Sequence, residues 1–129
     1  MINELLLTIG NKNYSSWSLR PWLLMKHLGI DFSERILPLD TPEFTRDIAA
    51  LNPAKRVPFL RHGDLQIWDS LAICEYVCEL AGGGWPRARD ARAVARSVCA
   101  EMHSSFSVIR AQWPMNARAA GRKTAPNPE

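Results

Sequence analysis

Three serines stand close together after a short apolar run near the N-terminus, in the stretch NYSSWSLRPW at residues 13–22. A serine that precedes a helix commonly acts as an N-cap, because its hydroxyl accepts a hydrogen bond from a free backbone N–H. A serine hydroxyl at a helix start can also donate to a bound thiolate and so help to keep a thiol deprotonated near neutral pH. The stretch is therefore compatible with a structural cap and with a thiol-activating group.

Two further groups of residues carry potential chemistry. Arg56, Val57 and Pro58 open an apolar run, and proline is tolerated at the first residue of a strand. Asp69 and Ser70 stand where a helix pattern begins. A single capping residue satisfies that helix start, so two adjacent ones leave a spare polar group that faces outward.

The order of elements predicts how these groups are brought together. We expect a strand at 5–9, a helix from near 16–18 to Gly29, and a strand at 32–37. A short helix at 42–51, strands at 57–61 and 65–68, and a helix at 70–81 follow. Pro21 is expected in the first turn of its helix. The order β-α-β-α-β-β-α is that of an α/β, thioredoxin-like fold, a mixed four-stranded sheet with helices on both faces.

The remainder of the chain has a different pattern. After a linker at 83–89, one helix is predicted from 90 to 113, since apolar residues recur on one face from Ala91 to Trp113. Residues 119–129 carry Gly121, Pro126 and Pro128 without apolar periodicity and are predicted to be disordered. The expected organisation is a thioredoxin-like domain at 1–82, the linker, and an incomplete all-α domain at 90–129.

Cysteine usage excludes some functions. Thioredoxin-like redox proteins place a cysteine at the N-terminus of the first helix, whereas the first cysteine here is Cys74. Cys74, Cys78 and Cys99 lie in apolar helical patterns, which indicates reduced, buried thiols in a cytoplasmic protein. No Cys/His spacing predicts a metal site, and the apolar run at 5–9 is too short for a signal peptide or a membrane span.

The net charge of +3 is unevenly distributed, with 8 basic and 10 acidic residues before position 87 and 8 and 3 from there on. Four arginines cluster near the start of the last predicted helix, at positions 87, 89, 92 and 96. No aromatic residues are interleaved with them, so a solvated helix face is favoured over an RNA contact. We therefore expect no nucleic-acid partner.

Three stretches at these positions resemble the glutathione S-transferase family: Ser15 to Arg20, Asn52 to Pro58, and Asp69 to Tyr76. The last two are the more specific, and the serine loop is most similar to that of the zeta class and related bacterial enzymes. The resemblance covers residues 5–82, and the helix from Asp90 is similar to the first helix of the family's all-α domain. It implies a thioredoxin-like fold and glutathione as co-substrate.

The resemblance also implies roles for individual residues. Ser15 matches the catalytic serine, with Ser16 as its nearest competitor and Ser18 expected to act as a helix cap. Val57, before a proline that we predict to be cis, would pair its backbone with the cysteinyl part of glutathione. The complete implied glutathione-binding set is Ser16, Arg20, Lys55, Val57, Pro58, Asp69 and Ser70, where Asp69 and Ser70 hold the γ-glutamyl end and Lys55 or Arg56 pairs with the glycyl carboxylate.

The resemblance implies transfer of glutathione to an electrophile, with a maleyl-type isomerisation as a zeta-class option. The family's second domain is longer than the residues after Pro86, so Met102, Phe106 and Arg110 would supply only part of the substrate wall. The alternative is a truncated protein that binds glutathione without catalysis. Relatives are commonly dimers, and the apolar stripe would lack its usual partners, so we expect a homodimer or other self-association.

Overall fold

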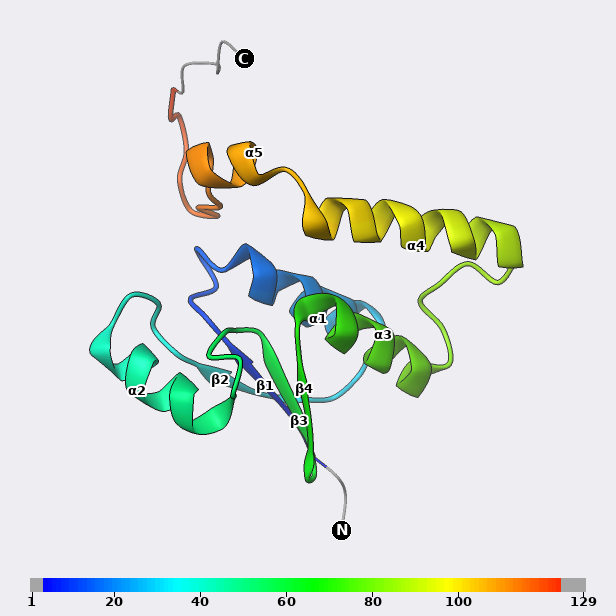
Figure 1. Ribbon diagram of the computed structural model, residues 1–129, viewed down its shortest axis with the longest axis horizontal. Helices are drawn as coiled ribbons and strands as arrows, with labels where there is room; N and C mark the ends of the chain where they lie inside the picture. The colour runs from blue at the N-terminus through cyan, green and yellow to red at the C-terminus, as the bar shows by residue number, and fades with distance from the viewer. Residues whose placement is uncertain (1–3, 124–129) are drawn as a thin grey trace.

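The computed structural model describes residues 4–123, which form four strands and five helices (Figure 1). The first part of the chain contains β1 (Leu5–Ile9), α1 (Ser16–His27), β2 (Ser33–Ile36), α2 (Pro42–Leu51), β3 (Phe59–His62), β4 (Leu65–Trp68) and α3 (Ser70–Ala81). Two helices follow, α4 (Arg89–Ser104) and α5 (Ser107–Gln112). The element order predicted for residues 5–81 is confirmed.

The four strands form one mixed sheet in the order β2-β1-β3-β4. β1 is parallel to β2, and the pairs β1–β3 and β3–β4 are antiparallel. α1 and α3 pack against each other, while α2 lies apart from them (Figure 1). This arrangement is the thioredoxin-like fold that the element order predicts.

The core lies between the sheet and the pair α1–α3. Leu7 and Leu60 from the sheet meet Met25 from α1 and Ile73 and Val77 from α3, and all five side chains are fully buried. Four of the five residues of β1 are buried and Leu6 is half-buried, as expected of a central strand that is covered on both faces. The packed core fixes the end of β1 and the starts of β3 and α3. The candidate site residues lie next to these three points.

The start of α1 differs in detail from the prediction, and that of α2 does not. α1 begins at Ser16, so Pro21 lies in its second turn and not in its first. A proline there supplies no N–H to the carbonyl one turn earlier, but its ring is buried against the core. The start of α2 is as predicted, with Thr41 as N-cap, Pro42 at the first helical position and Thr41 Oγ1 accepting from Phe44 N at 3.1 Å.

The single helix predicted over 90–113 is broken in two. α4 ends at Ser104, and Phe106 adopts a left-handed backbone conformation with φ of 64° before α5 begins. The Arg110 side chain folds back and donates to the Ser105 carbonyl at 2.9 Å and to the Met102 carbonyl. These bonds satisfy carbonyls that a continuous helix would have used, which explains a break that contains neither glycine nor proline.

The chain after α5 contacts the loop before α1. Ala117 N donates to the Asn13 carbonyl at 3.0 Å, and Arg118 N donates to Asn13 Oδ1 at 2.8 Å. Residues 119–123 contain neither helix nor strand. The remainder of the predicted disordered tail, residues 124–129, lies outside the described residues.

A carboxylate on β2 connects the sheet to the serine loop and α1. Glu34 accepts from Trp22 Nε1 at 2.6 Å and pairs with Lys12 Nζ at 2.6 Å. The hydrogen bond from Lys12, reinforced by the one from Trp22, lowers the pKa of Glu34 below its ordinary value. Glu34 therefore ties the segment before the serines to the body of the domain.

Replacing Glu34 by glutamine should lower the free energy of unfolding at pH 7 by about 1 kcal/mol, the upper end for an ion pair that is partly exposed to solvent. A depressed native pKa gives stability that is present above the unfolded pKa and lost as the pH falls through the native value. Urea unfolding at pH 7 and pH 3 should thus show a difference that shrinks on acidification. The same change at the exposed Glu79 serves as control, and a difference independent of pH would contradict the prediction.

Candidate functional site

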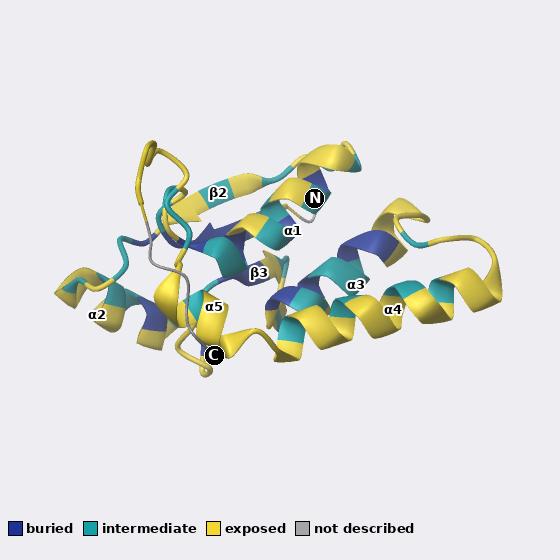
Figure 2. Ribbon diagram, turned by 90° about the horizontal axis from the view of Figure 1, so that it is seen from above, coloured by how far each residue is buried: buried dark blue, intermediate teal, exposed yellow. Residues whose placement is uncertain are grey.

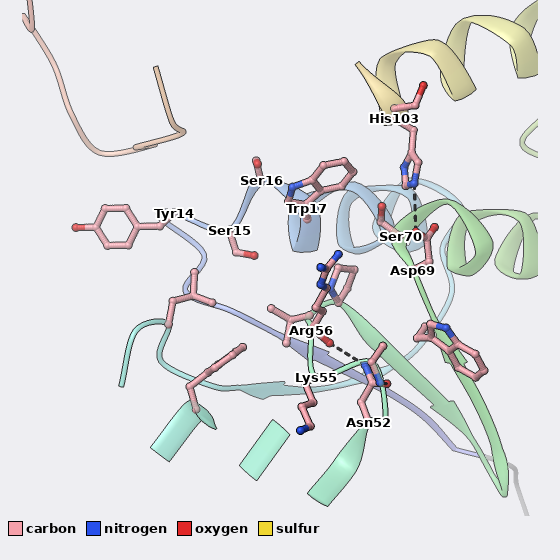
Figure 3. A pocket seen from close by; sticks show the side chains of 17 residues that line it. Tyr14, Ser15, Ser16, Trp17, Asn52, Lys55, Arg56, Asp69, Ser70 and His103 are labelled. Carbon is pink, nitrogen blue, oxygen red and sulfur yellow. Dashed lines mark hydrogen bonds and ion pairs between the residues drawn. The ribbon is translucent and has the colours of Figure 1, made fainter. Parts of the chain in front are cut away.

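A cavity of about 910 Å³ opens where the serine loop, the loop after α2 and the start of α3 meet (Figure 3). This volume falls in the usual range of small-molecule sites, on the order of 300–1,000 Å³. The cavity gathers nearly all the residues that the sequence proposes for glutathione: Ser15, Ser16, Lys55, Arg56, Val57, Pro58, Asp69 and Ser70.

Ser15 is positioned by the start of α1 and by the end of β1. It is the N-cap of α1, and its Oγ accepts from Ser18 N at 3.4 Å. Its hydroxyl donates to Ser18 Oγ at 2.7 Å, and Gly10 N donates to the same oxygen at 3.1 Å. Ser15 and not Ser18 is thus the cap, which corrects the expectation by one helical turn. Ser16 also lines the cavity and is less buried than Ser15.

The loop after α2 is held by a buried asparagine. Asn52 is 1% exposed; its Nδ2 donates to the Arg56 carbonyl at 2.9 Å, and its Oδ1 accepts from Ala54 N at 2.9 Å. The loop carries Lys55 and Arg56 to the cavity and ends in Val57, whose bond to Pro58 is cis, as predicted. Asn52 therefore positions this wall of the site, a role beyond the simple turn that its sequence context suggests.

Replacing Asn52 by alanine should cost about 1–3 kcal/mol of unfolding free energy, since it removes two hydrogen bonds that a buried side chain makes to the loop. Chemical denaturation measures this effect. Lys55→Ala on the same loop is the matched control and should leave stability within about 0.5 kcal/mol, because that side chain is exposed. Equal stability of the two variants would show that Asn52 does not hold the loop.

The opposite end of the cavity is formed by the start of α3. Asp69 is the N-cap, with a φ of 76° that is uncommon for a residue other than glycine, and its Oδ1 accepts from Leu71 N at 2.9 Å. Ser70 is 3% exposed, and its Oγ has no hydrogen-bond partner among the described residues. An unpartnered buried hydroxyl beside the free N–H groups of a helix start suits an anionic ligand group.

Sequence reasoning missed the residues that reach the cavity from α4 and from the first turn of α1. His103 lines the cavity, and its Nε2 lies 3.2 Å from Asp69 Oδ2. The ring of Trp17 lies edge-on to His103 at 5.1 Å between centroids. The guanidinium groups of Arg20 and Arg110 lie 3.9 Å and 4.6 Å from the centroid of Trp17. Burial, and then the nearby charge of Arg110, lower the pKa of Arg20. These contacts attach α4 and α5 to the first domain.

Some predicted site residues lie elsewhere. Arg20 and Met102 line a separate apolar cavity of about 220 Å³ between α1, α3 and α4. Phe106 is 52% exposed, and Arg110 is engaged by Trp17 and by backbone carbonyls. Met102, Phe106 and Arg110 do not line the large cavity, which α4 reaches through His103 and Ser104.

The three cysteines are free, and all of them line this smaller cavity. Burial raises the pKa of Cys74 to about 12 and that of Cys78 above its ordinary value. Such thiols are poor nucleophiles at neutral pH, so they contribute packing rather than chemistry.

Residues 4–123 contain neither a metal-binding cluster nor a membrane-spanning helix. No group of His, Cys, Asp or Glu side chains within that range has an arrangement that could bind a metal ion. None of the helices described there has the length and apolar character needed to span a bilayer.

Known proteins share both the sequence and the fold of this region. Residues 14–80 match the family model of the glutathione S-transferase N-terminal domain. The probable glutathione S-transferase GSTF2 of Oryza sativa subsp. japonica is 39% identical over 67 residues, which are 49% of this chain and 30% of that protein. The chain thus spans less than a third of the length of this curated relative.

Solved structures extend the likeness beyond the sequence match. A Burkholderia glutathione transferase homolog with bound glutathione superposes with a TM-score of 0.70 at 26% identity, over 81% of this chain and 59% of that one. Human glutathione S-transferase T1-1 gives a TM-score of 0.74 at 29% identity, over 84% and 47%. The theta-class enzyme of Xanthomonas axonopodis pv. citri, with glutathione bound, gives 0.69 at 25%, over 87% and 54%. The chain belongs to the glutathione S-transferase family, and residues 14–80 form its N-terminal domain.

Proposed function

We propose that this chain binds glutathione in the large cavity and stabilises its thiolate for transfer to an electrophile. The observation that carries the proposal is that one cavity holds the serine loop, the Val57–Pro58 segment and the Asp69–Ser70 pair. These are the three stretches on which the family resemblance rests. Two of the structural relatives, from Burkholderia and Xanthomonas, were solved with glutathione bound.

The chemistry of the cavity suits an extended tripeptide. The hydroxyl of Ser70 and the N–H groups at the start of α3 can receive the γ-glutamyl carboxylate, while Asp69 can receive the ammonium group. The Val57 backbone can pair with the cysteinyl residue as a short added strand. Lys55 or Arg56 can pair with the glycyl carboxylate at the far end.

Ser15 is the residue we assign to thiol activation. A free thiol has a pKa of about 8.5, so only a minority is ionised at neutral pH. A hydroxyl that donates to sulfur stabilises the thiolate over the thiol and lowers that pKa. The thiol proton leaves to solvent, and the thiolate sulfur forms a bond to the electrophilic atom of the second substrate. In a substitution the bond to the leaving group breaks and that group departs with its electron pair, as chloride does from a chlorinated dinitrobenzene; in an addition the pair stays on the acceptor, which is then protonated. The serine loop's similarity to the zeta class makes a maleyl-type compound one electrophile to assay.

A second candidate function is binding of glutathione without turnover. It is favoured by the placement of Met102, Phe106 and Arg110 outside the large cavity. These residues therefore do not form the wall that was expected to bind the electrophile. Protein of this kind would retain glutathione and ionise its thiol, and would show no reaction beyond that in solution.

Three measurements test the proposal. The chain should be retained on immobilised glutathione and released by free glutathione, and bound glutathione should show thiolate absorbance near neutral pH. Turnover of a chlorinated dinitrobenzene then separates the transferase from the binding protein. Failure of retention, with a folded chain, would overturn both candidates. Retention and thiolate formation without turnover would support the second candidate alone.

A further inference from the structure

We propose that Ser18 is a positioning residue that turns the Ser15 hydroxyl toward the thiolate, and that Gly10 N–H anchors this pair. The inference rests on the proposed function, because it concerns how Ser15 stabilises glutathione. It assigns to Ser18 a role in place of the helix cap that the sequence predicts.

The contacts form a short chain from the backbone to the cavity. Gly10 N lies 3.1 Å from Ser18 Oγ, and Ser18 Oγ lies 2.7 Å from Ser15 Oγ. Ser18 is 3% exposed and does not line the large cavity, whereas Ser15 does. Ser15 therefore stands between Ser18 and any ligand in that cavity.

The number of protons on the two hydroxyls determines the direction of these hydrogen bonds. Each hydroxyl has one proton to donate and two lone pairs that can accept. Without a ligand, the Ser15 proton is used on Ser18 Oγ. When Ser15 donates to a thiolate, the contact between the two oxygens must be made by the Ser18 proton, with Ser15 Oγ as acceptor. Ser18 Oγ still accepts from Gly10 N–H, so all three donors then point toward the negative charge.

Such an alignment strengthens the terminal donor. Hydrogen bonds in series polarise one another, and the effect is larger in a shielded environment. A Ser15 hydroxyl whose oxygen accepts a hydrogen bond from Ser18 is a better donor to sulfur than one without that partner. The alignment also fixes the Ser15 rotamer, so less freedom is lost when the thiolate binds.

The backbone at residue 10 makes the close approach feasible. A Cβ on Gly10 would lie 3.0 Å from the Ser15 Cβ and 2.9 Å from the Leu39 side chain. A larger residue would push the serine loop away from the end of β1. The absence of a side chain at Gly10 thus allows its N–H to reach Ser18.

The test compares Ser18→Thr with Ser18→Val, which have the same shape and differ in the hydroxyl. A cavity of about 220 Å³ beside Ser18 leaves room for the added methyl groups. The readout is the pKa of bound glutathione, titrated by thiolate absorbance, together with kcat at neutral pH. We expect the valine variant to titrate higher than the threonine variant by about half a unit to one unit, which is a three- to tenfold decrease in the ionisation constant of the bound thiol. Glutathione affinity should be similar in both.

An equal pKa of bound glutathione in the two variants would overturn the role of Ser18. A second comparison, of Ser18→Ala with wild type, removes the hydroxyl without adding volume. A purely structural Ser18 would change stability alone and leave the titration of the bound thiol unmoved. The proposed function fails separately, since it predicts a lowered thiol pKa in the wild-type protein that is lost in Ser15→Ala. A wild-type protein that lowers this pKa, with no effect of Ser18, would overturn only the present inference.

Discussion

Replacing Ser15 by alanine should raise the pKa of bound glutathione and lower turnover at neutral pH by about ten- to hundredfold. The lower bound corresponds to one pKa unit, and the upper bound approaches the loss seen when one donor to a developing anion is removed. Affinity for glutathione should change little, because the ends of the tripeptide are held by other residues. Spectroscopic titration of the bound thiol and steady-state kinetics measure the two effects.

Ser15 is also the N-cap of α1, so the alanine variant should lose about 1 kcal/mol of stability. Ser15→Thr separates the two roles, since threonine caps a helix and retains a hydroxyl donor; it should recover most of the stability and of the thiol ionisation. Ser16→Ala is the neighbouring control. A larger shift of the thiol pKa in Ser16→Ala than in Ser15→Ala would move the assignment by one residue.

The second large effect concerns the apolar row on α4 and α5. Val94, Val98, Phe106 and Ile109 are between 51% and 64% exposed, and most of α4 is solvent-facing (Figure 2). Covering apolar surface is worth about 25 cal/mol per Å², so several such side chains together favour association by a few kcal/mol. An association free energy of that size corresponds to a dissociation constant near the millimolar range. We therefore expect self-association of the chain at high concentration, measurable by sedimentation, and strong binding of a hydrophobic dye.

Val98→Glu should weaken this association, raising the concentration at half-assembly by about tenfold or more, and should reduce dye fluorescence. Ala100→Glu is the matched control, because Ala100 is exposed on the same helix but outside the apolar row. A wild-type chain that remains monomeric at high concentration, with little dye bound, would show that this row needs no partner.

The first domain could be predicted closely because its signals are local. Thr41 before Pro42, Asp69 before an apolar helix pattern, and the left-handed Gly29 and Gly82 at helix ends each report the conformation of their own neighbours. The sequence does not determine which serine caps α1, because Ser15 and Ser18 are both suitable residues and only the fold decides which hydroxyl meets which N–H.

The contributions of α4 and α5 could not be predicted, because they depend on contacts across long sequence separations. The apolar repeat on α4 predicts a face without its usual partners, and that face is exposed; it does not include Cys99 or His103, which line the cavities toward the first domain. The break at Phe106 depends on Arg110, whose guanidinium lies over Trp17, far away in the chain. The role of Asn52 likewise required its contact with the Arg56 carbonyl to be seen.

The Asp69–His103 contact has a thermodynamic consequence. Asp69 Oδ1 caps α3, and Oδ2 holds the imidazole of a helix that lies outside residues 14–80. In the proposed complex, the γ-glutamyl ammonium approaches the same carboxylate, so ligand and helix compete for one oxygen. Linkage makes this competition reciprocal: the factor by which docking of α4 lowers the affinity for glutathione equals the factor by which bound glutathione weakens the docking of α4. Amide hydrogen exchange in α4 would therefore report the occupancy of a pocket built mainly by other elements.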